Sequence, residues 1–298
     1  MLRGRANFES SNVIVTCCAS RISLNLDPHT NLVDLAMGLF EYLNYGCSIL
    51  ITSSIKILLR FVLSITRLLD VRIGLVPKSE SIRPRHKFLV PSSKCKDRNI
   101  EVHLYYPSST KDEDYPIPVH VNFHGSGFCL PCFGTDAELC TYIANRVGCV
   151  IVDADYAKAP RHPHPTAIND AHDVLAFIAS KPETFDHQRV SVGGYSSGGN
   201  IAMLAAVSLP ENIPLSIKAI VAWYAPTDLS KTGKKDVPWL VKRIHRATRQ
   251  CYLPPWKDSR DPKISPLFEE SALFPPTTLI VRIHAFCPDP CIPLLILH

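Results

Sequence analysis

Ser196 stands in the run Gly194-Tyr195-Ser196-Ser197-Gly198, directly before a long apolar stretch. A serine hydroxyl is a poor nucleophile until a base removes its proton and hydrogen-bond donors stabilise the oxyanion that forms. A sharp turn between a strand and a helix exposes such a serine beside a backbone N–H, and the crowded turn requires small neighbours. Gly194 and Gly198 are those neighbours. The pattern predicts Ser196 as a nucleophile for acyl transfer, with a plain glycine-rich loop as the alternative.

A second glycine-bearing loop, His124-Gly125-Ser126-Gly127, follows a short β-rich run upstream. It has the form of an HGGG-type oxyanion loop, in which backbone N–H groups bind the negative oxygen. Ser126 replaces the middle glycine, but a small residue can serve because only its N–H is needed. We expect the N–H groups of Ser126, Gly127 and Ser197 as donors. His124 is expected to fix the loop through hydrogen bonds rather than to act as the base for Ser196.

The elements that must position these residues alternate between strands and helices. Apolar and β-branched runs predict strands at residues 100–106, 119–123, 149–152, 190–192, 217–223 and 277–283, and helices at 166–180 and 199–209. Strands separated by helix-length segments predict a mostly parallel sheet with helices on both faces, an α/β fold. The strand at 190–192 and the helix that follows it favour the nucleophile interpretation of Ser196 over a plain loop.

The chain of 298 residues is long enough for one large α/β domain or two small ones. Residues 1–30 are polar and irregular, and we expect them to be poorly ordered. Residues 31–80 carry apolar residues at helical spacing and are expected to form a helical cap or a membrane-associated segment, with a basic linker running to about residue 91. Residues 81–298 form the predicted α/β domain. Within it, residues 228–262 break the alternation and are expected to form a lid insertion.

Composition limits the partners. The formal net charge is only +5, and the basic clusters lack any groove-reading motif, so no nucleic acid is expected. The apolar segment 32–69 carries five charged side chains, and its longest uncharged run, 42–55, is shorter than the roughly 20 residues of a spanning helix. It is either a pair of amphipathic helices over the core or an interfacial anchor, and we favour the former. The irregular spacing of eleven cysteines predicts reduced thiols, and a cytoplasmic protein follows.

Three motifs in order resemble the hormone-sensitive-lipase branch of the α/β-hydrolases, over about residues 85–281. They are His124-Gly-Ser-Gly127, Asp155-Tyr156-Ala-Lys-Ala-Pro160 with its His162-Pro-His-Pro165 continuation, and Gly194-Tyr-Ser-Ser-Gly-Gly-Asn200. The middle motif is similar to the family's DYRxAPExPxPA segment, although Ala157 replaces its Arg and Arg161 its Glu. Asp170 matches the helix that follows. The resemblance implies an α/β-hydrolase fold and a serine esterase or lipase-like enzyme. Such an enzyme forms an acyl-enzyme intermediate on small or medium-chain hydrophobic esters, without metal or cofactor.

The resemblance also implies an Asp shortly after the strand at 277–283 and a His about thirty residues later. After Val281 the sequence follows neither pattern, so we expect the last strand and helix to be missing, through a frameshift, a misread intron or a truncation. Asp289 is the candidate acid, with an exposed turn residue as the alternative, and no histidine is assigned as the base. Weaker candidates are Asp258 and Asp261 for the acid, and His284 and His298 for the base.

Two functions follow from these observations. The first is a carboxylic-ester hydrolase. The second is a catalytically impaired protein on the same scaffold that binds a small hydrophobic ligand, because the related gibberellin receptors keep the pocket and lack the histidine. An anchored lipase acting at a membrane surface through residues 32–69 is a third hypothesis.

Overall fold

The computed structural model describes residues 12–17, 20–25, 45–50, 52–54, 83–111, 114–231, 239–281 and 295–297. The chain divides into two compact units, Met1–Gly46 and Cys47–His298. Most of the predicted cap at 31–80 lies outside the described residues. None of the helices in the ranges given above is both long and apolar enough to cross a membrane.

The first unit contains two strands, β1 (Asn12–Cys17) and β2 (Ser20–Asn25), which pair antiparallel. Val13 lies opposite Leu24, and Val15 lies opposite Ile22. β-Branched residues favour this extended pairing. The hairpin falls within residues 1–30, where the sequence pattern predicted no regular element.

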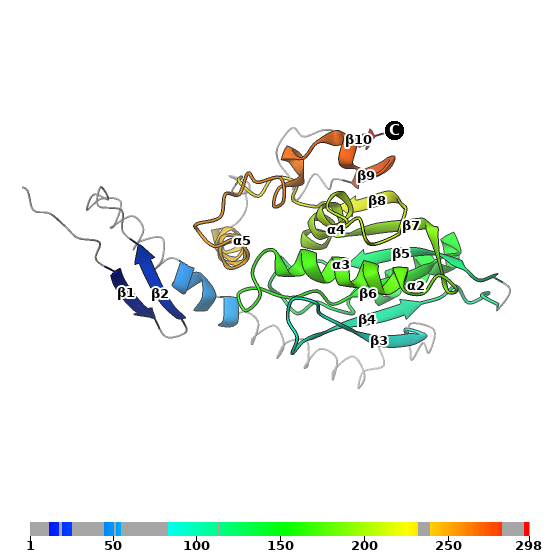
Figure 1. The fold of residues 1–298 in the computed structure, drawn as a ribbon, viewed down its shortest axis with the longest axis horizontal. Coiled ribbons are helices and arrows are strands. Elements are labelled where there is room, and N and C mark those ends of the chain that lie inside the picture. The colour runs from blue at the N-terminus through cyan, green and yellow to red at the C-terminus, as the bar shows by residue number, and fades with distance from the viewer. Residues whose placement is uncertain are drawn as a thin grey trace, which may run out of the picture. The chain divides into compact units, whose positions relative to one another are not determined.

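The second unit is built on an eight-stranded sheet in the order β10-β9-β8-β7-β5-β6-β4-β3 (Figure 1). Its strands are β3 (His86–Pro91), β4 (Asn99–Tyr105), β5 (Ile117–Phe123), β6 (Val150–Ala154), β7 (Phe185–Tyr195), β8 (Ile217–Trp223), β9 (Thr277–Val281) and β10 (Leu295–Leu297). The five strands from β9 to β6 run parallel, whereas β3, β4 and β10 are antiparallel to their neighbours. The predicted mostly parallel sheet is confirmed.

Helices cover both faces of this sheet. They are α2 (Ala137–Val147), α3 (Thr166–Ala179) and α4 (Ser197–Val207). The unit also contains α5 (Trp239–Tyr252) and the short 3₁₀ turns η3 (Pro266–Phe268) and η4 (Ser271–Leu273). Side chains alternate between faces along a strand. On β6, Val150 and Val152 pack in the cluster that contains α3 and α4, whereas Ile151 packs with Cys140 of α2. Therefore α2 covers one face, and α3 and α4, which lie side by side in Figure 1, cover the other.

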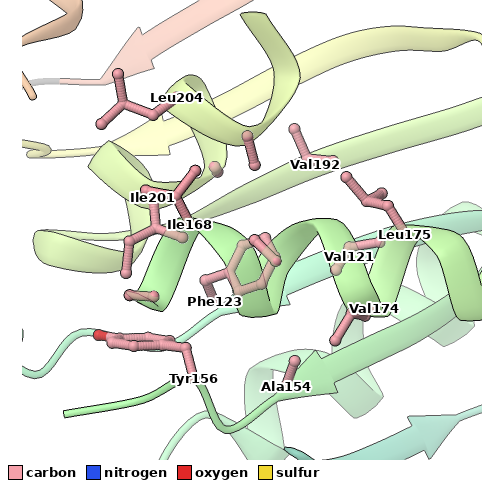
Figure 2. Close-up of a cluster of buried hydrophobic side chains, with 14 of the residues drawn as sticks. Val121, Phe123, Ala154, Tyr156, Ile168, Val174, Leu175, Val192, Ile201 and Leu204 are labelled. Atoms are coloured by element: carbon pink, nitrogen blue, oxygen red, sulfur yellow. The ribbon is translucent and has the colours of Figure 1, made fainter. Parts of the chain in front are cut away.

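The larger core lies between the sheet and the pair α3 and α4. Figure 2 shows Val121, Phe123 and Val192 from the sheet meeting Leu175 of α3 and Ile201 of α4. Each such side chain contributes roughly 1.5–3 kcal/mol on full burial. The first nine residues of α4 are all buried, which explains why this helix is made of small and apolar residues on every side. The turn that carries Ser196 is thereby anchored by a helix that is buried over nine of its residues.

Four elements of this unit differ from the sequence prediction. The predicted basic linker up to residue 91 is wrong over its last part, because residues His86–Pro91 form the edge strand β3. The helix α2 was not predicted, and β7 begins at Phe185 rather than at residue 190. Residues Leu295–Leu297, in a stretch where no strand was expected, pair with β9 at the other edge.

Candidate active site

Ser196 occupies a sharp turn between β7, which ends at Tyr195, and α4, which begins at Ser197. Its backbone has φ 50° and ψ −119°. A positive φ is costly for a residue with a side chain and persists only where the surroundings impose it. The Ser196 N–H donates to the Trp223 carbonyl at the end of β8 (2.8 Å), which ties the turn to the neighbouring strand. The geometry is that of the predicted nucleophile elbow.

Glycines let the backbone close around this turn. A Cβ on Gly194 would lie 2.2 Å from the Phe123 carbonyl oxygen, and one on Gly198 would lie 1.8 Å from the same atom. Neither distance is compatible with a side chain, so both positions require glycine. The close contact presses the start of α4 against the end of β5. It thereby sets Ser196 beside the loop that follows β5.

That loop begins at His124 and passes close to Ser196. A Cβ on Gly125 would lie 3.7 Å from the Ser196 Cβ. The backbone then turns through two residues with positive φ, Gly127 at 54° and Phe128 at 63°. In the described part of the chain, the N–H groups of Gly127 and Ser197 have no hydrogen-bond acceptor. Two of the three predicted oxyanion donors are therefore open.

The third predicted donor is engaged. The Ser126 N–H donates to the Ser197 Oγ at 2.9 Å, and both residues are buried. The sequence prediction considered only the backbone N–H of Ser197 and missed its side chain as a competing acceptor. A serine directly after the nucleophile, opposite a loop with free N–H groups, was the signal that could have indicated it.

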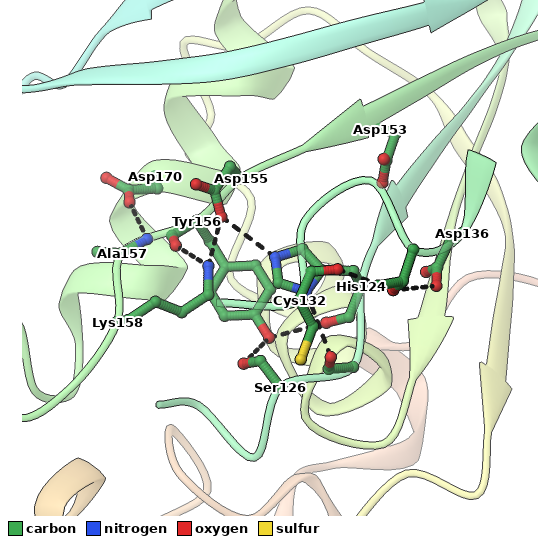
Figure 3. A network of polar contacts seen from close by, with 12 residues as sticks. His124, Ser126, Cys132, Asp136, Asp153, Asp155, Tyr156, Ala157, Lys158 and Asp170 are labelled. Carbon is green, nitrogen blue, oxygen red and sulfur yellow. Dashed lines mark hydrogen bonds and ion pairs between the residues drawn. The ribbon is translucent and has the colours of Figure 1, made fainter. Parts of the chain in front are cut away.

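His124 is held by an ion-pair network away from Ser196 (Figure 3). Its Nε2–H donates to Asp155 Oδ1 at 3.2 Å, and Lys158 Nζ donates to the same oxygen at 2.6 Å. Burial opposes ionisation of Asp155, but these two donors outweigh it and lower the pKa of Asp155 to about 2. Burial also lowers the pKa of His124 below its ordinary value. The His124 ring nitrogens thus lie against Asp155 and the Gly125 carbonyl, and not against Ser196.

Tyr156 joins the loop to the nucleophile helix. Its ring stacks on His124 with centroids 4.7 Å apart, and Lys158 Nζ lies 3.8 Å from the ring centroid on Tyr156. Its hydroxyl donates to the His124 carbonyl at 2.8 Å and lies 2.6 Å from Ser126 Oγ and 3.1 Å from Ser197 Oγ. This buried hydroxyl connects three segments that are distant in the sequence (Figure 3).

The Asp155–Ala157 segment is fixed in turn by Asp170 of α3. Asp170 Oδ2 accepts the Ala157 N–H at 2.7 Å, and Oδ1 accepts the Ser92 hydroxyl at 3.2 Å and pairs with Arg98. The Asp170 side chain is 1 % exposed. Burial raises the pKa of Asp170, and the Arg98 charge and the hydrogen bonds oppose that rise. Asp170 thus links the edge strands to the segment that carries Tyr156.

The strand–turn–helix around Ser196 and the loop after β5 are features shared with a known family. Residues 120–287 match the sequence profile of a family described as the alpha/beta hydrolase fold, which is more than half of the chain. The chain belongs to the α/β-hydrolase fold family. This membership confirms the resemblance drawn from the three motifs.

Individual relatives of this α/β-hydrolase agree with the assignment. It is 31% identical over 169 residues to an AB hydrolase superfamily protein of Schizosaccharomyces pombe, covering 53% of this chain and 50% of that protein. It is 30% identical over 164 residues to carboxylesterase NlhH of Mycobacterium tuberculosis, covering 52% and 50%. The chain thus spans about half the length of these curated relatives. The Pyrobaculum calidifontis esterase shares the fold, with a TM-score of 0.60 at 24% identity over 77% of this chain and 73% of that one.

In this α/β-hydrolase the helix α5 packs directly on the oxyanion loop. The Tyr252 ring stacks on Phe128 with centroids 3.8 Å apart and planes at 6°, and its hydroxyl lies 3.3 Å from His164 Nδ1. On α5, Gln250 also accepts the Ser48 hydroxyl at 2.5 Å. The part of the predicted insertion that forms α5 is therefore in contact with the loop after β5. Its role as a lid stays a prediction.

An open cavity of about 880 Å³ lies on the α2 side of the nucleophile turn. It is lined by residues next to Ser196, by α2 and by the end of β8: Gly125, Cys132, Thr135, Asp136, Glu138, Leu139, Thr141, Tyr142, Tyr195 and Tyr224. The lining mixes aromatic rings with two carboxylates. Among the described residues no cluster of His, Cys, Asp or Glu has the composition of a metal site.

Some of the remaining candidates for acid and base lie within the described residues and some lie outside them. Asp258 and Asp261 lie in turns, where Asp258 accepts the N–H of Arg260 and Asp261 that of Lys263, both at 2.9 Å. In the ranges that the structure describes, no histidine is hydrogen-bonded to Ser196. The other candidates, Asp289, His284 and His298, lie outside the described residues.

Proposed function

We propose that this protein is a carboxylic-ester hydrolase in which Ser196 is the nucleophile. The observation that supports this most strongly is the strained backbone of Ser196, held between β7 and α4 beside the Gly125–Gly127 loop. Strain at a single non-glycine residue, maintained by close backbone contacts, is typical of a functional position. The esterases and carboxylesterases among its relatives point to the same chemistry.

The proposed reaction proceeds in two steps. Ser196 Oγ attacks the ester carbonyl carbon while a base takes its proton, and the N–H groups of Gly127 and Ser197 stabilise the oxyanion. The bond to the alcohol then breaks, and the alkoxide leaves with a proton. Water hydrolyses the resulting acyl-enzyme, releases the carboxylic acid and restores the Ser196 hydroxyl. Asp289 remains the proposed acid of the triad, and we assign no residue to the base.

The test is hydrolysis of p-nitrophenyl acetate and butyrate by the purified chain and by Ser196→Ala. We expect the variant to lose about a thousandfold or more in kcat, since removal of a triad nucleophile leaves only the catalysis due to binding and the oxyanion hole. Equal rates for the two proteins would refute the proposal. The butyrate ester also addresses the proposed preference for small or medium-chain hydrophobic substrates.

A second candidate function is ligand binding without turnover. The observation that favours it is the engagement of the Ser126 N–H by Ser197, which removes one oxyanion donor from the resting site. Calorimetric titration with butyrate and short hydrophobic esters distinguishes the two functions. Binding with no difference in turnover between wild type and Ser196→Ala would favour the binding protein.

Membrane contact through residues 32–69 is a separate proposal. It rests on the apolar composition of that segment, which carries only five charged residues. Flotation with anionic and neutral vesicles, with and without residues 1–76, measures it. Equal flotation of both forms would exclude a role for the segment.

A further inference from the structure

Every hydroxyl proton in the cluster around Tyr156 can be assigned. The His124 carbonyl can only accept, so the Tyr156 proton must be donated to it. Ser126 and Ser197 must then each donate to the Tyr156 oxygen, at 2.6 Å and 3.1 Å, because that oxygen has no second proton. A hydroxyl that donates once keeps its lone pairs. The Ser197 Oγ is therefore oriented as an acceptor, and it accepts the Ser126 N–H at 2.9 Å.

This arrangement has a cost for catalysis. An N–H that already donates to Ser197 must give up that bond before it can stabilise an oxyanion on the substrate. The four groups are buried: Tyr156 is 1 % exposed, Ser197 0 %, Ser126 4 % and His124 0 %. Water is therefore not at hand to replace a broken bond. The Ser197 Oγ and the substrate oxyanion therefore compete for the Ser126 N–H, and no water offsets the bond that is lost.

The loop has the freedom to exchange one acceptor for the other. Ser126 lies between Gly125 and Gly127, and Gly127 already has a φ of 54°. Glycine permits a peptide group to rotate at low cost. Beyond Gly127 the chain is fixed by the stacking of Phe128 on Tyr252. The Ser126 carbonyl is also held, by the N–H groups of Cys129 (3.1 Å) and Leu130 (2.8 Å). The exchange therefore requires rotation of the Gly125–Ser126 peptide.

We propose that the Ser197 hydroxyl is a positioning residue that holds the Ser126 N–H away from the oxyanion site in the resting protein, and that this N–H is transferred to the oxyanion during acyl transfer. The inference rests on the proposed function, since it concerns the same oxyanion. No covalent bond changes in this step. One N–H exchanges the Ser197 Oγ for the substrate oxygen.

Kinetics test the consequence for the reaction. Ser197→Ala removes the competing acceptor and keeps the backbone donor of residue 197. We expect kcat for p-nitrophenyl butyrate to rise about tenfold with KM unchanged, because a full oxyanion donor is worth a hundredfold or more. Ser197→Thr restores the hydroxyl and is expected to return kcat to the wild-type value. An unchanged or lower kcat in Ser197→Ala would overturn the proposal, since a merely structural hydroxyl gives that result.

A second measurement does not depend on turnover. Amide hydrogen exchange at Ser126, followed by NMR on the full chain, reports whether Ser197 holds this N–H. We expect about tenfold faster exchange in Ser197→Ala, which corresponds to the loss of one net hydrogen bond. Tyr156→Phe, which disturbs the same cluster but leaves that bond in place, should keep the protection. Equal exchange in wild type and Ser197→Ala would refute the resting bond.

The two tests separate the two proposals. If wild type and Ser196→Ala hydrolyse the esters at equal rates, the proposed function fails, and the exchange measurement still decides whether Ser197 holds the Ser126 N–H. If Ser196→Ala alone is inactive and Ser197→Ala gains no rate, the nucleophile stands and the positioning role of Ser197 is refuted.

Discussion

Gly198 and Phe123 touch through backbone atoms alone: a methyl group on the Gly198 Cα would lie 1.8 Å from the Phe123 carbonyl oxygen. Gly198 is in the first turn of α4, and Phe123 is the last residue of β5. The contact therefore sets the spacing between Ser196 and the loop that begins at His124. Because the neighbour is a carbonyl in the middle of a sheet, it cannot move aside as a flexible side chain would.

Gly198→Ala should consequently destabilise the protein strongly. Overpacking in a rigid core typically costs 1–3 kcal/mol, and we expect a loss of about 3 kcal/mol or more in the free energy of unfolding. Urea unfolding measures it. The control is Gly46→Ala, where an added Cβ would meet nothing within 4 Å among the described residues and the residue is helical. Alanine is expected there to be neutral or to stabilise by up to about 1 kcal/mol. Similar losses in both variants would contradict this account.

The buried carboxyl of Asp153, on β6, is expected to make the stability of the protein depend on pH. Burial raises the pKa of Asp153 to about 7, and the hydrogen bond from Asn122 (2.8 Å) opposes this only in part. Between its ordinary pKa of 3.8 and about 7, the folded protein keeps a proton that the unfolded chain has lost. The free energy of unfolding therefore falls as pH rises through this window, by up to about 4 kcal/mol.

Asp153→Asn replaces the carboxyl with a neutral group of the same shape. We expect the variant to be more stable than the wild type at pH 8 and to lose that advantage at pH 4.5. Urea unfolding at the two pH values checks it. Asp97→Asn, the same change at an exposed carboxyl, is the matched control. A constant difference between Asp153→Asn and wild type over this range would refute the assignment.

The buried pair Arg98 and Asp170 is expected to act as a unit. Arg98→Met leaves the Asp170 charge buried at 1 % exposure and should cost about 3 kcal/mol. Adding Asp170→Asn removes the orphaned charge and should recover at least 1 kcal/mol of that loss. Thermal unfolding of the two single variants and the double variant measures the coupling. Strictly additive losses would show that the pair is not coupled.

The control is Arg189→Met, at an ion pair whose Arg189 is 61% exposed. It should change stability by less than about 0.5 kcal/mol.

Tyr252 anchors α5 to the oxyanion loop. Tyr252→Ala removes a ring that is 1 % exposed and stacked on Phe128, and should destabilise by about 3–4 kcal/mol in guanidinium unfolding. Tyr252→Phe keeps the ring and loses only the contact with His164, so about 1 kcal/mol is expected. Tyr142→Ala, at a side chain 62% exposed, should change little. A loss for Tyr252→Ala no greater than for Tyr142→Ala would mean that α5 is not held by this stack.

The strands β5 and β6 and the helix α4 could be predicted because most of their side chains are buried, which requires nearly continuous small or apolar residues. The strand β3 was missed since only Val90 of its residues is buried, and its Lys87 and Pro91 are residues that suit a sheet edge. The helix α2 fully buries only Cys140 and Ala144, and these small side chains give a weak apolar pattern in the sequence.

At the site, sequence reasoning found the positions but not the directions of side chains. The space that a nucleophile elbow needs indicated Gly194 and Gly198, and the HGGG-type pattern indicated the Gly125–Gly127 loop. The roles of the Ser197 Oγ and the Tyr156 hydroxyl could not be predicted, because their hydrogen-bond partners come from segments that only the fold brings together. A cue for α2 was present in Gly148, whose left-handed φ of 74° ends the helix, as glycine commonly does at this position.

The two helices that follow β5 and β7 depart to opposite faces of the sheet, α2 to one and α4 to the other. Adjacent strands whose chains diverge in this way leave a crevice at their carboxyl ends, whatever side chains are placed there. In this protein Gly125 and Ser196 stand on either side of that topological switch point. Connectivity alone thus provides a place for a ligand. Replacement of the Ser196 side chain would leave this crevice in place, because the course of the backbone forms it.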